Sequence, residues 1–192
     1  MPTLPDEAIT PRLHLRIWRT ADAAILNDAV HDNLDHLRPW MPWIAFEPRT
    51  LTDRERLIRG WVDAWRDGGD AVYGAFDADG KLVASAGLHK RAGPECLEVG
   101  YWVHRDHLGK GYATELTRYL TDAAFTVDGI DRVELKIDQA NEASARVPAR
   151  LGFTHGEIKQ IEPVAPGEVG IDHCWFVTSD GWPTPEASGL AF

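Results

Sequence analysis

The segment Leu108-Gly109-Lys110-Gly111-Tyr112-Ala113 joins an apolar, strand-like stretch, residues 97–103, to a helical pattern. The helix is indicated by apolar residues that recur on one face, namely Ala113, Leu116, Leu120, Ala124 and Val127. A strand, a glycine-containing turn and a helix in this order leave backbone N–H groups unpaired at the start of the helix. Such groups attract an anion. The segment therefore predicts an anion site at a strand-to-helix turn.

The residues of the turn favour a pyrophosphate as that anion. Gly109 and Gly111 let a phosphate approach the main chain closely, and Lys110 adds positive charge. A P-loop is excluded, because its first glycine would fall on His104 and the lysine is followed by glycine instead of Ser or Thr. A dinucleotide fingerprint fits poorly, because its third glycine would fall on Thr114. A tight turn without a ligand is the alternative that the segment alone leaves open.

The N-terminal part of the chain predicts one strand and two helices. Residues 12–18 alternate apolar and polar side chains as a half-buried strand does, and Thr20 then offers the N-cap of a first helix. That helix is expected to end before residues 38–43, where two prolines predict a non-helical turn. A second helix is predicted to open with a capping box at residues 52–55 and to end at Gly68-Gly69. Its apolar face consists of Ile58, Trp61, Val62 and Trp65.

The rest of the chain predicts a mixed sheet. The predicted strands are residues 71–76, 82–89, 97–103, 132–138, 153–161 and 169–178. The first three form an antiparallel meander, and a short helix is expected at residues 144–151. No repeat or linker interrupts this order, so residues 1–192 are expected to form a single domain. We predict an α/β (α+β) fold with a mixed, mostly antiparallel sheet of about seven strands, flanked by helices.

Composition narrows the classes of partner. The 192 residues carry a formal net charge of −10 without clusters of Lys and Arg, which argues against nucleic acid. The acidic charge fits a cationic partner, and the alternative is that it serves solubility alone. No apolar run is long enough to span a membrane, and we expect a cytoplasmic protein. Cys96 and Cys174 lie in strand-like stretches and are expected to be reduced core thiols. The pair His104 and His107 lacks the further ligands that a metal site needs, so no metal is expected.

A second motif follows the glycine turn about thirty residues further on. It consists of residues 141–144, Asn-Glu-Ala-Ser, followed by residues 150–153, Arg-Leu-Gly-Phe. Together the two motifs resemble the GNAT acyltransferases, whose coenzyme A signature is [QR]-x-x-G-x-[GA] and whose second block is N-x-x-[AS] ending in [KR]-x-G-F. Residues 34–43 and 98–102 resemble the branch that contains the ribosomal-protein N-terminal acetyltransferases RimJ and RimL. The resemblance spans roughly residues 10–180 and implies a GNAT fold, splayed at its fourth strand.

The resemblance implies acetyl-CoA as co-substrate. The residues expected to bind it are Trp102, Val103, Leu108, Gly109, Lys110, Gly111, Tyr112, Ala113, Thr114 and Asn141. Leu108 stands where the family usually has Gln or Arg, so we expect the pyrophosphate to be bound almost entirely by backbone N–H groups. Pro148 stands where many members have a tyrosine that protonates the departing thiolate, so the usual general acid is absent.

Two side chains are expected to move protons. Amine acetylation needs a neutral amine, and Glu98 lies where some family members have a general base. A solvated strand residue is the alternative for Glu98. The RimL-like branch implies that Ser144 donates a proton to the departing thiolate or holds a water there, and the alternative is that it caps the following helix. A backbone N–H near Trp102 or Val103 is expected to polarise the thioester carbonyl.

The acceptor is expected between the first two helices and the sheet, in a non-helical stretch. The candidate residues are Asp35, His36, Arg38, Trp40 and Trp43, with core packing as the alternative for the two tryptophans. We expect an N-acetyltransferase that acts in a ternary complex on a primary amine, namely a peptide or protein N-terminal α-amine. A small-molecule amine or antibiotic is a second possible acceptor, and a non-catalytic acyl-CoA-binding module is the alternative of another class. The expected assembly is a monomer or a homodimer.

Overall fold

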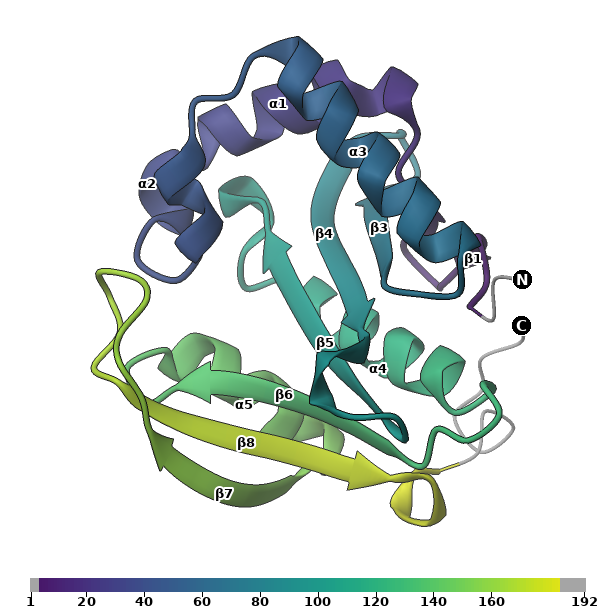
Figure 1. Ribbon diagram of the computed structural model, residues 1–192, viewed down its shortest axis with the longest axis vertical. Coiled ribbons are helices and arrows are strands. Elements are labelled where there is room, and N and C mark those ends of the chain that lie inside the picture. Colours follow the sequence, from purple (N-terminus) through teal and green to yellow (C-terminus); the bar gives the residue numbers. More distant parts are fainter. Residues whose placement is uncertain (1–3, 184–192) are drawn as a thin grey trace.

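One eight-stranded sheet runs through residues 4–183, the part of the chain that this computed structural model describes. The strands are β1 (Glu7–Ile9), β2 (His14–Ile17), β3 (Ala71–Phe76), β4 (Leu82–His89), β5 (Cys96–Val103), β6 (Arg132–Asp138), β7 (Thr154–Gln160) and β8 (Ile171–Thr178). Their order in the sheet is β1-β2-β3-β4-β5-β6-β8-β7 (Figure 1). The sequence predicted about seven strands because β1, with three residues, is too short to show an alternating pattern.

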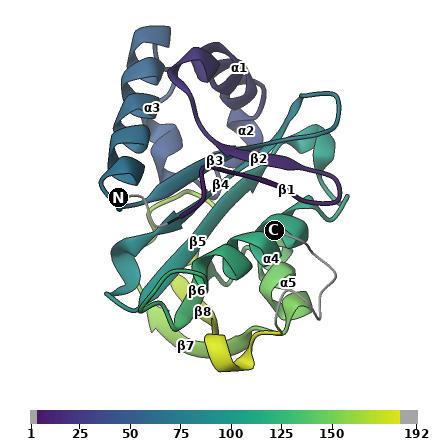
Figure 2. The same cartoon turned by 90° about the vertical axis from the view of Figure 1, so that its right-hand side faces the viewer.

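Helices cover both faces of the sheet. On one side lie α1 (Ala23–Asp32), α2 (Leu34–Leu37) and α3 (Leu51–Arg66), and on the other lie α4 (Tyr112–Ala124) and α5 (Glu142–Leu151) (Figure 2). The larger core packs α4 against the sheet through side chains such as Leu116 and Leu120. A second core lies under α1 and α3 and contains Trp18 and Trp102. No helix in the described part is long and apolar enough to cross a membrane.

Both predicted helix starts are wrong by a few residues. The cap of α3 is Thr50 instead of Thr52, since the Thr50 hydroxyl accepts the backbone N–H of Asp53 at 3.1 Å. Two overlapping Thr-x-x-acid patterns occur here, and the earlier one forms the cap. Thr20 is not a cap either. Residues 20–22 form a 3-10 turn in which the Asp22 carboxylate accepts the Arg19 backbone N–H at 2.8 Å, and α1 begins at Ala23.

The stretch around the first prolines is more helical than the sequence predicted. Residues 34–37 form α2, and Pro42–Phe46 form a 3-10 helix. Pro42 occupies the first turn of that helix, where a missing N–H costs nothing because it would be unpaired in any case. The expectation of a non-helical stretch at residues 35–43 is therefore wrong for Asp35, His36 and Trp43.

The parallel pairing of β5 with β6 is short. It comprises Cys96, Leu97 and Glu98 of β5, the last opposite Glu134 of β6. Beyond Glu98 the two strands diverge (Figure 1), whereas β5 stays paired with β4 along its whole length. The expected splay is present, but it lies at the fifth strand because β1 adds one strand in front. This divergence creates a gap in the middle of the sheet.

The loop between β7 and β8 closes back onto the α2 region. The Gly167 backbone N–H donates to the Pro39 carbonyl at 2.9 Å. Behind it, the buried Asp138 carboxylate at the end of β6 accepts the backbone N–H groups of Val169, Gly170 and Ile171 at 2.9–3.3 Å. The loop is thus fixed at its base by a carboxylate and at its tip by one main-chain contact with the N-terminal half of the chain.

Substituting Gly167 tests this contact. A Cβ at this position would lie 2.7 Å from both Pro39 Cβ and the Pro39 carbonyl oxygen, so Gly167→Ala must push the loop away. We expect a loss of about 1–3 kcal/mol in the free energy of unfolding, measured by urea denaturation. Gly60→Ala in α3 is the control, because nothing lies within 4 Å of its added Cβ, and it should stabilise the protein by up to about 1 kcal/mol. Equal stability of Gly167→Ala and wild type would show that the contact is not tight.

Candidate functional site

The glycine turn between β5 and α4 has the geometry of an anion site. Gly109 and Gly111 have φ values of 71° and 82°, which only glycine adopts readily, and Gly111 is the N-cap of α4. The backbone N–H groups of residues 109–111 have no partner among the described residues, and those of residues 112–114 belong to the unbonded first turn of α4. Six consecutive N–H groups are thus free to hold a pyrophosphate.

An arginine that the sequence analysis did not consider holds this turn in place. The Arg12 guanidinium donates to the Lys110 carbonyl at 2.7 Å and pairs with Glu115 of α4 at 2.6 Å. The same guanidinium lies 4.5 Å from the centre of the Tyr112 ring. The Lys110 ammonium donates to the Asp106 carbonyl at 2.8 Å. Two cations therefore border the turn, although Leu108, at the position of the usual Gln or Arg, is exposed.

The gap between β5 and β6 leaves main-chain groups of β5 without a neighbouring strand. The N–H of His104 donates to Val83 of β4, so alternate residues of β5, Trp102 among them, bond to β4. The N–H groups of Tyr101 and Val103 have the opposite direction and point into the gap. The register therefore favours Tyr101 or Val103, and not Trp102, as the donor to a carbonyl bound there.

A pair of hydroxyl groups spans the gap. The Tyr101 hydroxyl lies 2.9 Å from the Ser144 hydroxyl at the start of α5. Burial raises the pKa of Tyr101 to about 12, while the bond with Ser144 acts in the opposite direction. Tyr101 therefore stays protonated near neutral pH and can donate. Asn141, not Ser144, is the N-cap of α5, because its side-chain oxygen accepts the Ser144 backbone N–H at 3.2 Å.

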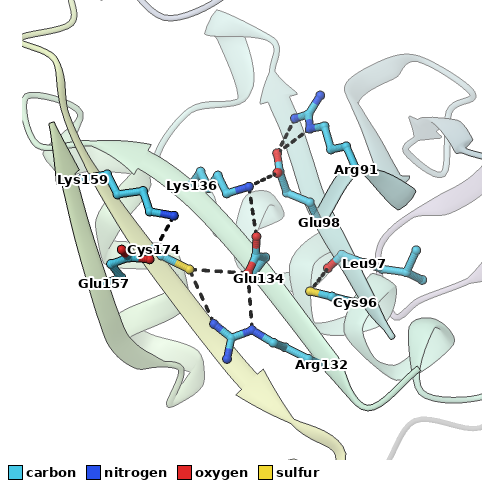
Figure 3. Close-up of polar contacts among 10 residues, drawn as sticks. All are labelled: Arg91, Cys96, Leu97, Glu98, Arg132, Glu134, Lys136, Glu157, Lys159 and Cys174. Carbon is cyan, nitrogen blue, oxygen red and sulfur yellow. Dashed lines mark hydrogen bonds and ion pairs between the residues drawn. The ribbon is translucent and has the colours of Figure 1, made fainter. Parts of the chain in front are cut away.

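The predicted base, Glu98, is engaged in ion pairs (Figure 3). One carboxylate oxygen accepts from the Arg91 guanidinium, and the other lies 3.1 Å from the Lys136 ammonium, which also pairs with Glu134. Glu98 is only 5% exposed. Burial alone would raise the pKa of Glu98, but the two cations outweigh it and lower the pKa. Its geometry is that of a structural anchor at the last paired residue of β5.

A cavity of about 910 Å³ lies between the gap and helices α1 and α3. Tyr101, Ser144 and Glu98 line it, so it reaches the residues described above. Its aromatic lining consists of Trp40, Trp43, Phe46, Trp61, Tyr101 and Trp102.

The predicted acceptor residues divide into two groups. Trp40 and Trp43 line the cavity, but Asp35, His36 and Arg38 do not, because α2 turns Asp35 and Arg38 to the surface. The His36 ring instead hydrogen-bonds to the backbone of Val103. Two of the lining residues had no predicted role: Tyr101 lies within residues 98–102 but was given no function there, and Lys136 belongs to no motif.

Comparison with known proteins agrees with this geometry. The family described as "Acetyltransferase (GNAT) domain" matches residues 12–154. The "Probable N-acetyltransferase YjcK" of Bacillus subtilis (strain 168) is 30% identical over 166 residues, covering 85% of this chain and 88% of its own length.

Two solved structures share the fold. Mycobacterium smegmatis RimJ, in complex with CoA-disulfide, superposes with a TM-score of 0.84 at 23% identity, covering 98% of this chain and 97% of its own. RimL, the ribosomal L7/L12 α-N-protein acetyltransferase, in complex with coenzyme A, gives a TM-score of 0.80 at 17% identity, covering 91% and 98%. With its glycine turn, its divided sheet and the family match over most of its length, the chain belongs to the GNAT acetyltransferases.

Proposed function

We propose that the chain transfers the acetyl group of acetyl-CoA to the N-terminal α-amine of a peptide or protein, in a ternary complex. The observation that carries the proposal is the gap between β5 and β6, which opens on the cavity and contains the Tyr101–Ser144 hydroxyl pair. The glycine turn at residues 108–113 would hold the pyrophosphate of coenzyme A through its free N–H groups.

The chemistry requires three contributions from the protein. A main-chain N–H of Tyr101 or Val103 stabilises the negative charge that develops on the thioester oxygen. The amine nitrogen, once neutral, bonds to the carbonyl carbon as the carbon–sulfur bond breaks. The Ser144 hydroxyl then gives its proton to the thiolate and regains one from Tyr101, to which it is hydrogen-bonded, and the proton that the nitrogen loses as the amide forms restores the Tyr101 hydroxyl. This pair supplies the proton that the tyrosine missing at position 148 provides in many relatives.

The rim of the cavity favours a peptide as acceptor. Phe46, Ile161 and Val164 line the cavity and are exposed by 69%, 40% and 63%. An exposed apolar rim of this kind suits a chain that extends out of the cavity better than a single small molecule. The name of the structural neighbour RimL, a ribosomal L7/L12 α-N-protein acetyltransferase, points in the same direction.

Two further expectations belong to this proposal. We infer that residues 1–192 form one acetyltransferase domain, supported by the single sheet and by the family match at residues 12–154. We also propose that the enzyme works in the cytoplasm, where acetyl-CoA and newly made protein N-termini occur together.

The acceptor class is tested with a panel of amines. Purified protein and acetyl-CoA are incubated with peptides that carry a free N-terminus, with the same peptides blocked by acetylation, and with small amines including aminoglycosides. We expect release of free thiol with the free peptides, in preference to the small amines. Faster acetylation of the small amines would show that the acceptor is a small molecule and not a peptide. Binding of the coenzyme without turnover on any acceptor would favour a non-catalytic acyl-CoA-binding module.

Ser144→Ala tests the proton donor. We expect kcat to fall by about 10²-fold or more with saturating acetyl-CoA, since general acid catalysis contributes about 10²–10⁴-fold. Acetyl-CoA affinity, measured by calorimetry, should change little, because Asn141 and not Ser144 caps α5. Tyr101→Phe should lower kcat less, since it removes only the second hydroxyl. Unchanged turnover of Ser144→Ala would exclude the role.

Gly111→Ala tests backbone recognition of the pyrophosphate. A side chain at a φ of 82° costs about 1–2 kcal/mol, so the turn is expected to rearrange and coenzyme A affinity to fall about 10-fold by calorimetry. Gly129→Ala, at a φ of 81° in the loop after α4, carries the same strain away from the turn. It should lower stability but leave coenzyme A affinity unchanged. Equal affinities of the two variants would contradict the proposal for the turn.

A further inference from the structure

Four carboxylates line the cavity, and three of them have partners. Glu98 is paired with two cations, and Asp138 accepts main-chain N–H groups at the start of β8. Glu168 accepts the backbone N–H groups of Val164 at 2.7 Å and Ala165 at 3.0 Å. The negative charges of these three carboxylates are therefore compensated by groups of the protein itself.

Asp172 is the fourth carboxylate. Within residues 4–183, its side chain has neither a hydrogen bond nor an ion pair, although it is only partly exposed. It lies near the start of β8, opposite Asp138 of β6. The Asn141 N–H donates to the Asp138 carbonyl at 2.9 Å, and α5 with Ser144 follows directly. The unpaired carboxylate thus lies beside the turn that positions the proposed proton donor.

The surroundings of Asp172 are short of free positive charge. The charged groups that face it are Glu98 on β5, Lys136 and Asp138 on β6, Lys159 on β7 and Glu168 in the β7–β8 loop. Both lysines have other partners, since Lys159 lies 3.0 Å from Glu157 and Lys136 pairs with two glutamates. Burial raises the pKa of Asp172, Lys136 opposes this, and the three carboxylates add to it. A cation from outside would relieve this repulsion.

We propose that Asp172 binds the ammonium group of the acceptor and takes its proton before acetyl transfer. This inference rests on the proposed function and deepens it. One ammonium proton passes to the Asp172 carboxylate, and the freed lone pair bonds to the carbonyl carbon. The carbon–sulfur bond breaks, and the sulfur receives a proton from Ser144. Of the two protons still on the nitrogen, one stays on the new amide and the other is released to replace the proton that the Ser144–Tyr101 pair has given to the sulfur, while Asp172 returns its proton to water.

The cavity offers a second feature that suits an ammonium group. Trp40 and Trp43 line the same space, and aromatic faces attract cations. A raised pKa also makes Asp172 a stronger proton acceptor than Glu98, whose pKa is lowered by its two cations. The role that the sequence gave to Glu98 therefore fits Asp172 better.

The test measures amine kinetics of Asp172→Asn with saturating acetyl-CoA, using a peptide that the wild type acetylates. We expect kcat/KM for the peptide to fall about 10²-fold, with KM raised, and Asp172→Glu to restore part of the loss. In the wild type, kcat/KM should fall on acidification as Asp172 becomes protonated. In Asp172→Asn it should instead follow the fraction of free amine, with an apparent pKa of about 8.

The control is Asp180→Asn, the same substitution at an exposed aspartate just beyond the other end of β8. It should retain wild-type kinetics, and coenzyme A affinity should be equal in all variants. If the wild type acetylates the peptide but Asp172→Asn stays within twofold of it with an unchanged pH profile, the inference about Asp172 is wrong and the proposed function stands. If the wild type acetylates no amine, the proposed function itself fails.

A second measurement uses only the wild-type protein, so it tests the inference even if Asp172→Asn does not fold. Calorimetry with the wild type compares the peptide with a des-amino analogue that lacks only the ammonium group. We expect at least about tenfold weaker binding of the analogue at pH 7, and a smaller difference at a pH low enough to protonate Asp172. Equal binding of the two peptides at pH 7 would overturn the inference.

Discussion

The structure depends on the point at which β5 and β6 cease to pair. Glu98 holds that point, because its buried carboxylate joins Arg91 and Lys136, the latter on the neighbouring strand. Beyond it, the N–H groups of Tyr101 and Val103 have no strand to bond to, and buried main-chain groups require partners. A ligand with carbonyl groups can provide them. Glu98 is the buried member of this network, so removing its partner cations would leave a buried carboxylate without compensation, and the pairing of Glu98 fixes the position of the gap.

The carboxylates that line the cavity differ in function because they differ in their partners. Glu98 and Asp138 both line it, yet one is neutralised by cations and the other by main-chain N–H groups. The pKa of each of these two carboxyl groups is lowered, and both groups serve the fold. Asp172 lies directly opposite Asp138 but lacks such partners, and its pKa is raised. Two carboxylates on one face of the sheet thus separate into a structural role and a proposed catalytic one.

What the sequence predicted well is local. The strands at residues 71–76, 82–89 and 132–138 show clear patterns between turn residues, and the glycine turn acts through its own backbone. The start of α3 was displaced because threonine and acid recur at overlapping spacings near Thr50. The contact between Tyr101 and Ser144 joins residues 43 positions apart, and no local pattern announces it. Asp172 was missed for a different reason. Its side chain differs from the other carboxylates of the cavity in having no partner among the described residues, and only the packed structure shows this.

Pro148 links the fold to the chemistry in a way that its sequence position alone conceals. It replaces a tyrosine of many relatives, and as a proline inside α5 it also removes the N–H that would bond to the carbonyl four residues earlier. That carbonyl belongs to Ser144. The Tyr101 hydroxyl lies 3.4 Å from it and 2.9 Å from the Ser144 hydroxyl. Proline at position 148 thus removes the tyrosine of α5 and also leaves the Ser144 carbonyl free to orient Tyr101. In this site the tyrosine hydroxyl comes from β5 instead of α5.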